Sequence, residues 1–179
     1  MMTEGTDPQG AGAPASRESP LSGVRVLAVD DEPDILETIE DVLEGAEITR
    51  ADSYDEAVAK LGDDREYDLA ILDIMGVDGL NLLADTVNRG IPTIMLTAHA
   101  MNKETLKTSI TKGALAYLPK EELARLDRFV ADFLAAHRKG ESTWALLFDR
   151  LGAFFERSFG PQWRSDDPEF WKYYYYPFS

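Results

Sequence analysis

The sequence contains no cysteine and few basic residues for its size. Its 179 residues include 18 Lys and Arg against 33 Asp and Glu, which gives a formal net charge of −15. Without cysteine the chain forms neither a disulfide nor a zinc–thiolate site, and its composition suits a reducing cytoplasm. The acidic balance argues against a nucleic-acid binder, because affinity for the phosphate backbone depends on clustered Lys and Arg.

Long apolar runs are also missing. No apolar stretch approaches the roughly 18 residues that a membrane span needs. The N-terminus has neither the basic start nor the apolar stretch of a secretory signal. The two histidines, His99 and His137, are too few for a metal cluster. We therefore expect a cytoplasmic protein that binds neither nucleic acid nor membrane.

Three segments of different composition follow one another along the chain. Residues 1–22 are rich in Gly, Pro, Ala and Ser and hold almost no large apolar side chains, so we expect a disordered leader. Residues 23–140 alternate five times between strand and helix patterns. This alternation predicts an α/β fold with a doubly wound parallel sheet and helices on both faces. Residues 141–179 form an aromatic-rich C-terminal extension, which we expect to be helical.

The apolar spacing locates the individual elements of the α/β region. Strands are expected near residues 24–29, 47–51, 69–72, 94–96 and 116–119. Helices are expected after Pro33, after a capping box at residues 53–56, at residues 80–88 and 103–111, and from near Glu121.

Every expected strand but the second ends in a polar residue or pair, in chain order Asp30 with Asp31, Asp73, Thr97 and Lys120. Because the carboxyl ends of parallel strands line one crevice, these side chains should converge there. Carboxylates hold Mg²⁺, and a carboxylate is also a competent nucleophile toward phosphorus. An ammonium and a hydroxyl would neutralise and bind the transferring group. The pattern therefore predicts a magnesium-assisted phosphoryl site.

In this order and at these strand ends, the residues resemble the receiver domain of two-component response regulators, over about residues 24–136. The resemblance implies a flavodoxin-like sheet of strand order 2-1-3-4-5. It implies that Asp73 accepts a phosphoryl group from a histidine kinase or phosphotransfer protein. It also implies a Mg²⁺ site formed by Asp30, Asp31, Asp73 and the backbone carbonyl of Met75.

The resemblance further identifies the phosphate-binding and switch residues, which are Thr97, Ala98, Lys120 and Tyr117. On phosphorylation Thr97 would move toward the phosphate and Tyr117 would turn inward. The surface of the fourth helix, fifth strand and fifth helix would then change. Such a protein is a phosphoacceptor rather than an enzyme, with no activity beyond the loss of its own phosphoryl group.

Two features depart from the family pattern. The segment from Asp73 to Gly79 is two residues shorter than the usual loop and lacks its Met-Pro step, which affects the position of the metal ligand at Met75. Lys120 is preceded by Pro119 instead of followed by proline. Met75 and His99 occupy the positions that tune hydrolysis of the phosphoryl group. Because an apolar Met75 does not orient an attacking water, we expect a phosphorylated form that outlasts seconds.

The C-terminal extension holds 13 of the 18 aromatic residues of the chain (8 Phe, 3 Trp and 7 Tyr in all). A helix is expected between Ser142 and Gly160, with one apolar face formed by Trp144, Phe148, Leu151 and Phe155. This face either folds back onto the core of the α/β region or forms an interaction surface for a second copy or a downstream protein. The aromatic enrichment favours the interaction surface.

Two other functions compete with phosphoryl acceptance. A pseudo-receiver would keep the fold as an interaction scaffold without phosphate chemistry, and the shortened loop favours it. An aspartate-nucleophile phosphatase would need Asp-x-Asp after the first strand, which Asp31-Glu32-Pro33 does not supply. Residues 141–179 are also too short for a DNA-binding output domain. We therefore expect a response regulator that signals through protein contact.

Overall fold

The computed structural model describes residues 18–98 and 102–175, and it confirms the predicted parallel sheet. Its five strands lie in the order β2-β1-β3-β4-β5. All neighbouring strands are parallel. The strands span Arg25–Val29 (β1), Glu47–Ala51 (β2), Leu69–Asp73 (β3), Thr93–Thr97 (β4) and Ala116–Pro119 (β5).

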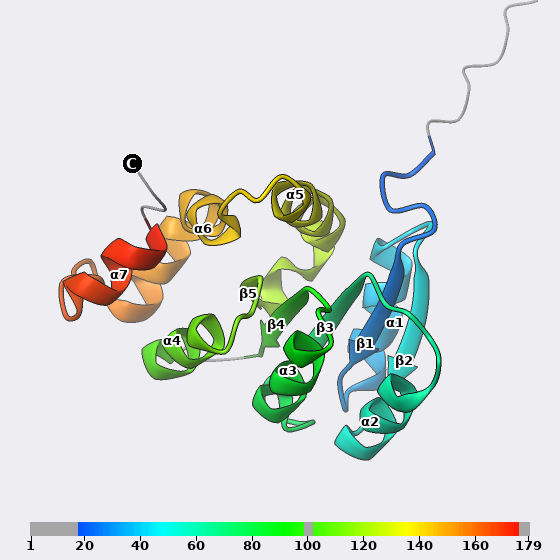
Figure 1. Ribbon diagram of the computed structural model, residues 1–179. Helices are drawn as coiled ribbons and strands as arrows, with labels where there is room; N and C mark the ends of the chain where they lie inside the picture. The colour runs from blue at the N-terminus through cyan, green and yellow to red at the C-terminus, as the bar shows by residue number, and fades with distance from the viewer. Residues whose placement is uncertain (1–17, 99–101, 176–179) are drawn as a thin grey trace, which may run out of the picture.

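Helices cover both faces of the sheet (Figure 1). One face carries α1 (Pro33–Val42) and α5 (Leu126–Arg138), and the other carries α2 (Tyr54–Gly62), α3 (Gly79–Asn88) and α4 (Lys103–Thr111). In residues 18–98 and 102–175, no helix has the length and apolar character required to cross a bilayer.

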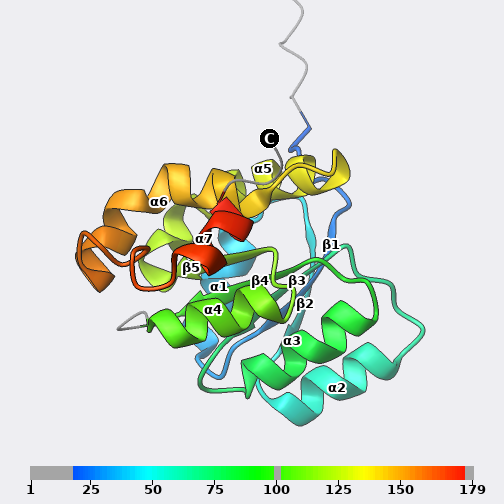
Figure 2. The ribbon, with the colours of Figure 1, turned by 60° about the vertical axis from the view of Figure 1, so that its left-hand side comes forward.

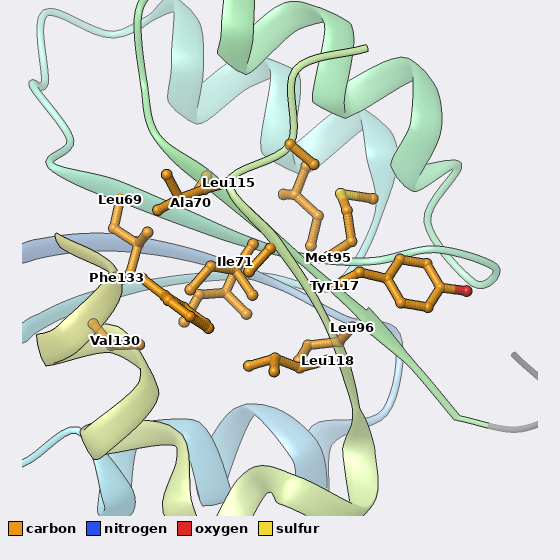
Figure 3. Close-up of a cluster of buried hydrophobic side chains, with 14 of the residues drawn as sticks. Leu69, Ala70, Ile71, Met95, Leu96, Leu115, Tyr117, Leu118, Val130 and Phe133 are labelled. Carbon is orange, nitrogen blue, oxygen red and sulfur yellow. The ribbon is translucent and has the colours of Figure 1, made fainter. Parts of the chain in front are cut away.

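The core lies against the two central strands. Every residue of β3 and β4 is buried, as expected for strands whose two faces are both covered by helices. Figure 3 shows Ile71 of β3 among side chains from β5 and α5, including Leu118 and Phe133. The uninterrupted apolar run at residues 69–72 is therefore explained by burial on both sides, and it brings Asp73 to the end of a rigid strand.

Two predicted boundaries are wrong. The last helix of the α/β region was expected from near Glu121, but residues Lys120–Arg125 form a 3₁₀ helix, η1, and α5 begins at Leu126. The tighter turn follows directly from β5 and keeps Lys120 beside the strand end. Residues 18–22 were expected to belong to a disordered leader, but they are part of the fold. Leu21 is a large apolar side chain in a turn that begins at Pro20, and it is buried in the core. Residues 1–17 of that leader lie outside the described residues.

The C-terminal extension forms two helices, α6 (Thr143–Phe159) and α7 (Pro168–Tyr175). Ser142 caps α6 as predicted, by accepting a hydrogen bond from the Ala145 N–H, and Gly160 follows the helix end. The sequence predicted a helical extension but did not locate α7 within it. Its start is set by Pro168 and by Asp167, whose side chain accepts a hydrogen bond from the Phe170 N–H.

The predicted interaction surface on α6 is wrong. Trp144, Phe148, Leu151 and Phe155 are only 8%, 2%, 4% and 0% exposed. They are part of one continuous core with the α/β region, because the short connection after α5 returns α6 to α5 and β5. Both views of the molecule show α6 and α7 beside α4, β5 and α5 (Figures 1 and 2). The extension therefore folds back onto the α/β region, the first of the two interpretations offered by the sequence.

Candidate functional site

The side chains of Asp30, Asp73 and Lys120 converge at the carboxyl ends of the strands, as the sequence predicted. Asp30 follows β1, Asp73 is the last residue of β3, and Lys120 follows β5. The Lys120 Nζ lies 2.7 Å from Asp30 Oδ2 and 3.2 Å from Asp73 Oδ1. All three side chains are nearly buried, with exposed fractions of 9% for Lys120, 0% for Asp30 and 5% for Asp73.

Burial and ion pairing act in opposite directions on the pKa values of Asp30 and Lys120. Burial raises the pKa of Asp30 above its ordinary value, although the Lys120 ammonium and the Glu32 N–H, which donates to Asp30 Oδ1 at 2.9 Å, oppose the increase. Burial alone would lower the pKa of Lys120. The carboxylates of Asp30 and Glu32 outweigh burial, and the pKa of Lys120 is raised. Lys120 is therefore protonated at neutral pH, while the charged form of Asp30 is disfavoured.

Two exposed carboxylates extend the site toward the surface. Asp30, Asp31 and Glu32 each place an oxygen within 4.8 Å of the others. Glu32 Oε1 also lies 3.0 Å from the Lys120 Nζ. Sequence reasoning missed Glu32, although its place directly after the acidic pair and before Pro33 was visible. With Asp73, the described site has four carboxylates, and three of them (Asp30, Glu32 and Asp73) pair with the Lys120 ammonium. This excess of hard oxygen donors fits a divalent cation such as Mg²⁺.

The shortened loop after β3 closes tightly on the aspartate. The Gly76 N–H donates to Asp73 Oδ2 at 2.9 Å. A Cβ at Gly79 would overlap the backbone carbonyl of Asp73, so this position requires glycine. A Cβ at Gly76 would overlap the carboxylate of Asp31, which therefore lies against the loop. The side chain of Met75 is 85% exposed and points away from the core.

The remaining predicted residues lie along the end of β4 and the middle of β5. Thr97 is the last residue of β4 and is buried, and Ala98 beside it is exposed. Tyr117 is 1% exposed, and its hydroxyl interacts with the Thr97 side chain and the Asn102 backbone. Burial raises the pKa of Tyr117 to about 12. His99 lies outside the described residues.

Comparisons with known sequences agree with this geometry. The profile of the family described as "Response regulator receiver domain" matches residues 26–130. The transcriptional regulatory protein TcrA of Mycobacterium tuberculosis is 32% identical over 126 residues, which cover 67% of this chain and 48% of TcrA. The two-component response regulator ARR12 of Arabidopsis thaliana is 35% identical over 104 residues, 55% of this chain and 17% of ARR12. The chain thus spans less than half the length of either relative.

Solved structures show the same fold. A two-component response regulator from Clostridium difficile superposes with a TM-score of 0.56 at 26% identity, covering 63% of this chain and 96% of that one. A response regulator from Thermotoga maritima gives a TM-score of 0.58 at 24% identity, covering 63% and 98%. Each match takes in nearly the whole of the other protein and leaves over a third of this chain unmatched.

Proposed function

The chain belongs to the receiver family of response regulators, and we propose that it accepts a phosphoryl group on Asp73 from a histidine kinase or a phosphotransfer protein. The observation that carries the proposal is the buried bridge formed by the Lys120 ammonium between Asp30 and Asp73. Each of these charged groups is costly to bury, and together they form a charged pocket at the strand ends, where ligands of open α/β sheets bind.

Each side chain has a distinct part in the transfer. An oxygen of Asp73 attacks phosphorus, and the bond from phosphorus to the donor's imidazole nitrogen breaks, with its electron pair remaining on that nitrogen. The Lys120 ammonium, 3.2 Å from Asp73 Oδ1, offsets the negative charge on the transferring group. The Gly76 N–H fixes the orientation of the Asp73 carboxylate. Thr97, with Ala98 beside it, would bind a phosphoryl oxygen through its hydroxyl.

Receiver domains bind Mg²⁺ at an acidic pocket, and the pocket of this chain has the donors to do so. We propose that Asp30, Asp31 and Asp73 hold the ion, with the backbone carbonyl of Met75. Glu32 joins them as a further donor, because its carboxylate belongs to the same group of oxygens. The ion would neutralise charge on the phosphoryl group, which the single ammonium does only in part.

The exposed Met75 bears on the lifetime of the phosphorylated form. Its side chain is apolar and 85% exposed beside the acceptor loop, so it offers no group that would orient a hydrolytic water. We expect a phosphorylated form that outlasts seconds, with His99 as the second tuning position. The output is proposed to be protein contact in the cytoplasm rather than binding to nucleic acid, in accord with the net charge of −15.

Incubation with a small acyl-phosphate donor and Mg²⁺ tests the proposal. Mass spectrometry should find one phosphoryl group on the peptide that contains Asp73, and removal of Mg²⁺ by a chelator should prevent its appearance. The Asp73→Asn variant should remain unmodified. Asp63→Asn is the matched control, because Asp63 is exposed at the end of α2, and it should react like the wild type.

A pseudo-receiver scaffold is the alternative, and the shortened loop after Asp73 is what favours it. If the wild type stayed unmodified with donor and Mg²⁺ while remaining folded, the protein would be assigned to that class. The buried ammonium between two carboxylates argues against this outcome, because a scaffold has no use for so costly a group.

A further inference from the structure

The C-terminal extension is fastened to α4 by two ion pairs. Lys103 pairs with Asp166, and the Lys107 Nζ lies 2.7 Å from Asp167 Oδ2. The same Lys107 ammonium lies over the ring of Phe170, 4.9 Å from its centroid. We call these five residues the α4 clamp. They join the turn segment at residues 161–167 and the start of α7 to the N-terminal half of α4.

The opposite end of the extension is fastened differently. The Thr143 hydroxyl donates to the backbone carbonyl of Leu115 at 2.6 Å, and the Trp144 Nε1–H donates to that of Ala114 at 3.0 Å. Both hydrogen bonds are buried, and they hold the start of α6 to the chain just before β5. The extension thus spans from β5 to α4 (Figure 2), with a buried attachment at one end and an exposed one at the other.

The residues of α4 that carry the clamp are also connected to the phosphoacceptor site. Asn102 caps α4 directly before Lys103, by accepting a hydrogen bond from the Glu104 N–H. The buried Tyr117 hydroxyl reaches both the Asn102 backbone and the Thr97 side chain. Thr97 in turn ends β4, the strand that pairs with the end of β3 through a hydrogen bond from the Ile74 N–H to the Leu96 carbonyl at 3.1 Å.

We propose that the extension is an autoinhibitory cover over α4 and β5, and that a phosphoryl group on Asp73 weakens the α4 clamp. The inference rests on the proposed function. A phosphoryl oxygen beside the end of β4 competes with Tyr117 for the Thr97 hydroxyl. Tyr117 then keeps its contact with the Asn102 backbone and loses the one with Thr97, so it no longer links the start of α4 to the end of β4. The position of Lys103 and Lys107 relative to the extension changes.

The α4 clamp is the weaker of the two attachments that hold the extension to the α/β region. The side chains of Asp166 and Asp167 are 64% and 42% exposed, and exposed ion pairs contribute little individually. The attachment of α6, by contrast, includes two buried hydrogen bonds and the aromatic core. A small displacement of α4 therefore opens the cover at the clamp and leaves α6 in place.

Coupling between two sites is reciprocal, so weakening the clamp should favour phosphorylation. The Asp166→Lys variant replaces an attraction to Lys103 by a repulsion and leaves Asp167, which caps α7, unchanged. It should accept phosphoryl groups from the same donor about two- to fivefold faster than the wild type, the range expected for one exposed pair. The double variant Lys103→Asp with Asp166→Lys restores the pair in reverse and should return the rate to that of the wild type.

Tryptophan residues in the extension report on whether it stays docked. All 3 tryptophans (Trp144, Trp163 and Trp171) lie in the extension, and all are buried. Phosphorylation should therefore increase quenching of tryptophan fluorescence by acrylamide, and it should speed hydrogen exchange in residues 161–175. Asp73→Asn should show neither change. Glu169→Gln, an exposed substitution on α7 outside the clamp, should behave as the wild type.

The outcomes separate the two proposals. Absence of phosphorylation at Asp73 in the wild type overturns the proposed function. If Asp73 is phosphorylated while quenching and exchange stay constant, and Asp166→Lys reacts at the wild-type rate, the autoinhibitory cover is refuted and phosphoryl acceptance stands. A slower reaction of Asp166→Lys would also refute the cover, since it would mean that the docked extension promotes phosphorylation.

Discussion

Replacement of Lys120 by methionine tests the electrostatics of the site most directly. The Lys120 ammonium lies within 3.2 Å of the carboxylates of Asp30 and Asp73, which are 0% and 5% exposed. Methionine keeps much of the apolar stem and removes the charge. The two buried carboxylates then face each other without a counter-charge.

The expected cost follows from the burial of these carboxylates. Breaking a buried ion pair by removing one partner costs about 3–5 kcal/mol, since the remaining charge stays desolvated. We expect the free energy of unfolding of Lys120→Met to fall by about this amount at pH 7 without Mg²⁺. The loss should shrink as the pH falls, because protonation of Asp30, whose pKa is already raised by burial, removes one of the unpaired charges.

Urea unfolding followed by circular dichroism measures this loss at pH 7 and at pH 5. Lys112→Met is the control, because Lys112 is exposed at the end of α4, and it should change stability by less than about 0.5 kcal/mol. In an Asp30→Asn background, the effect of Lys120→Met should be much smaller. A loss below about 1 kcal/mol, or an equal loss in that background, would refute the account of Lys120 as the counter-charge of buried carboxylates.

Three further predictions concern other parts of the molecule. Gly79→Ala should prevent phosphorylation in the acyl-phosphate assay, because its Cβ would overlap the backbone carbonyl of Asp73. The control Gly62→Ala, which has open space around its Cβ, should react normally. Equal reaction of the two variants would contradict the tight loop after β3. Phe155→Ala should lower the free energy of unfolding, measured by urea titration, by about 3–5 kcal/mol. Tyr173→Ala, at a position 67% exposed, should lower it by far less. Similar losses for the two variants would argue against a buried aromatic core. Asp30→Asn should stabilise the protein at pH 7 without Mg²⁺, because burial disfavours the charged carboxylate. That gain should disappear as the pH falls through the raised pKa toward the ordinary value of 3.8, and a gain that persists there in urea titrations would contradict it.

The fold and the convergence of the site were predictable because both follow from local patterns and topology. Apolar runs of strand length alternated with helical periodicity, and parallel strands necessarily present their carboxyl ends at one edge. The meeting of Asp30, Asp73 and Lys120 is therefore confirmed, while their chemical roles remain predictions. Glu32 was missed because it was considered only as a mismatch to a phosphatase motif, and its contact with Lys120 depends on the turn after β1.

The C-terminal extension could not be predicted to the same degree. Periodicity revealed that α6 has an apolar face, but it does not distinguish a partner within the chain from one outside it. The choice depends on Thr143 and Trp144, whose hydrogen bonds to backbone carbonyls before β5 are visible only in three dimensions. Likewise α7 was obscured by a dense aromatic sequence, in which Trp163 and Trp171 pack against each other with centroids 4.7 Å apart.

The hydrogen bonds from the start of α6 also bear on how the sheet ends. β5 is the outermost strand on its side of the sheet, and an open strand edge invites pairing with another chain. Thr143 and Trp144 occupy acceptors beside this edge, and the extension packs alongside it. A shortened protein that ends at residue 140 would uncover both the acceptors and the apolar surface under α6. We expect such a protein to associate with further copies of itself more readily than the 179-residue chain, because the acceptors and the apolar surface would then be open to a second copy.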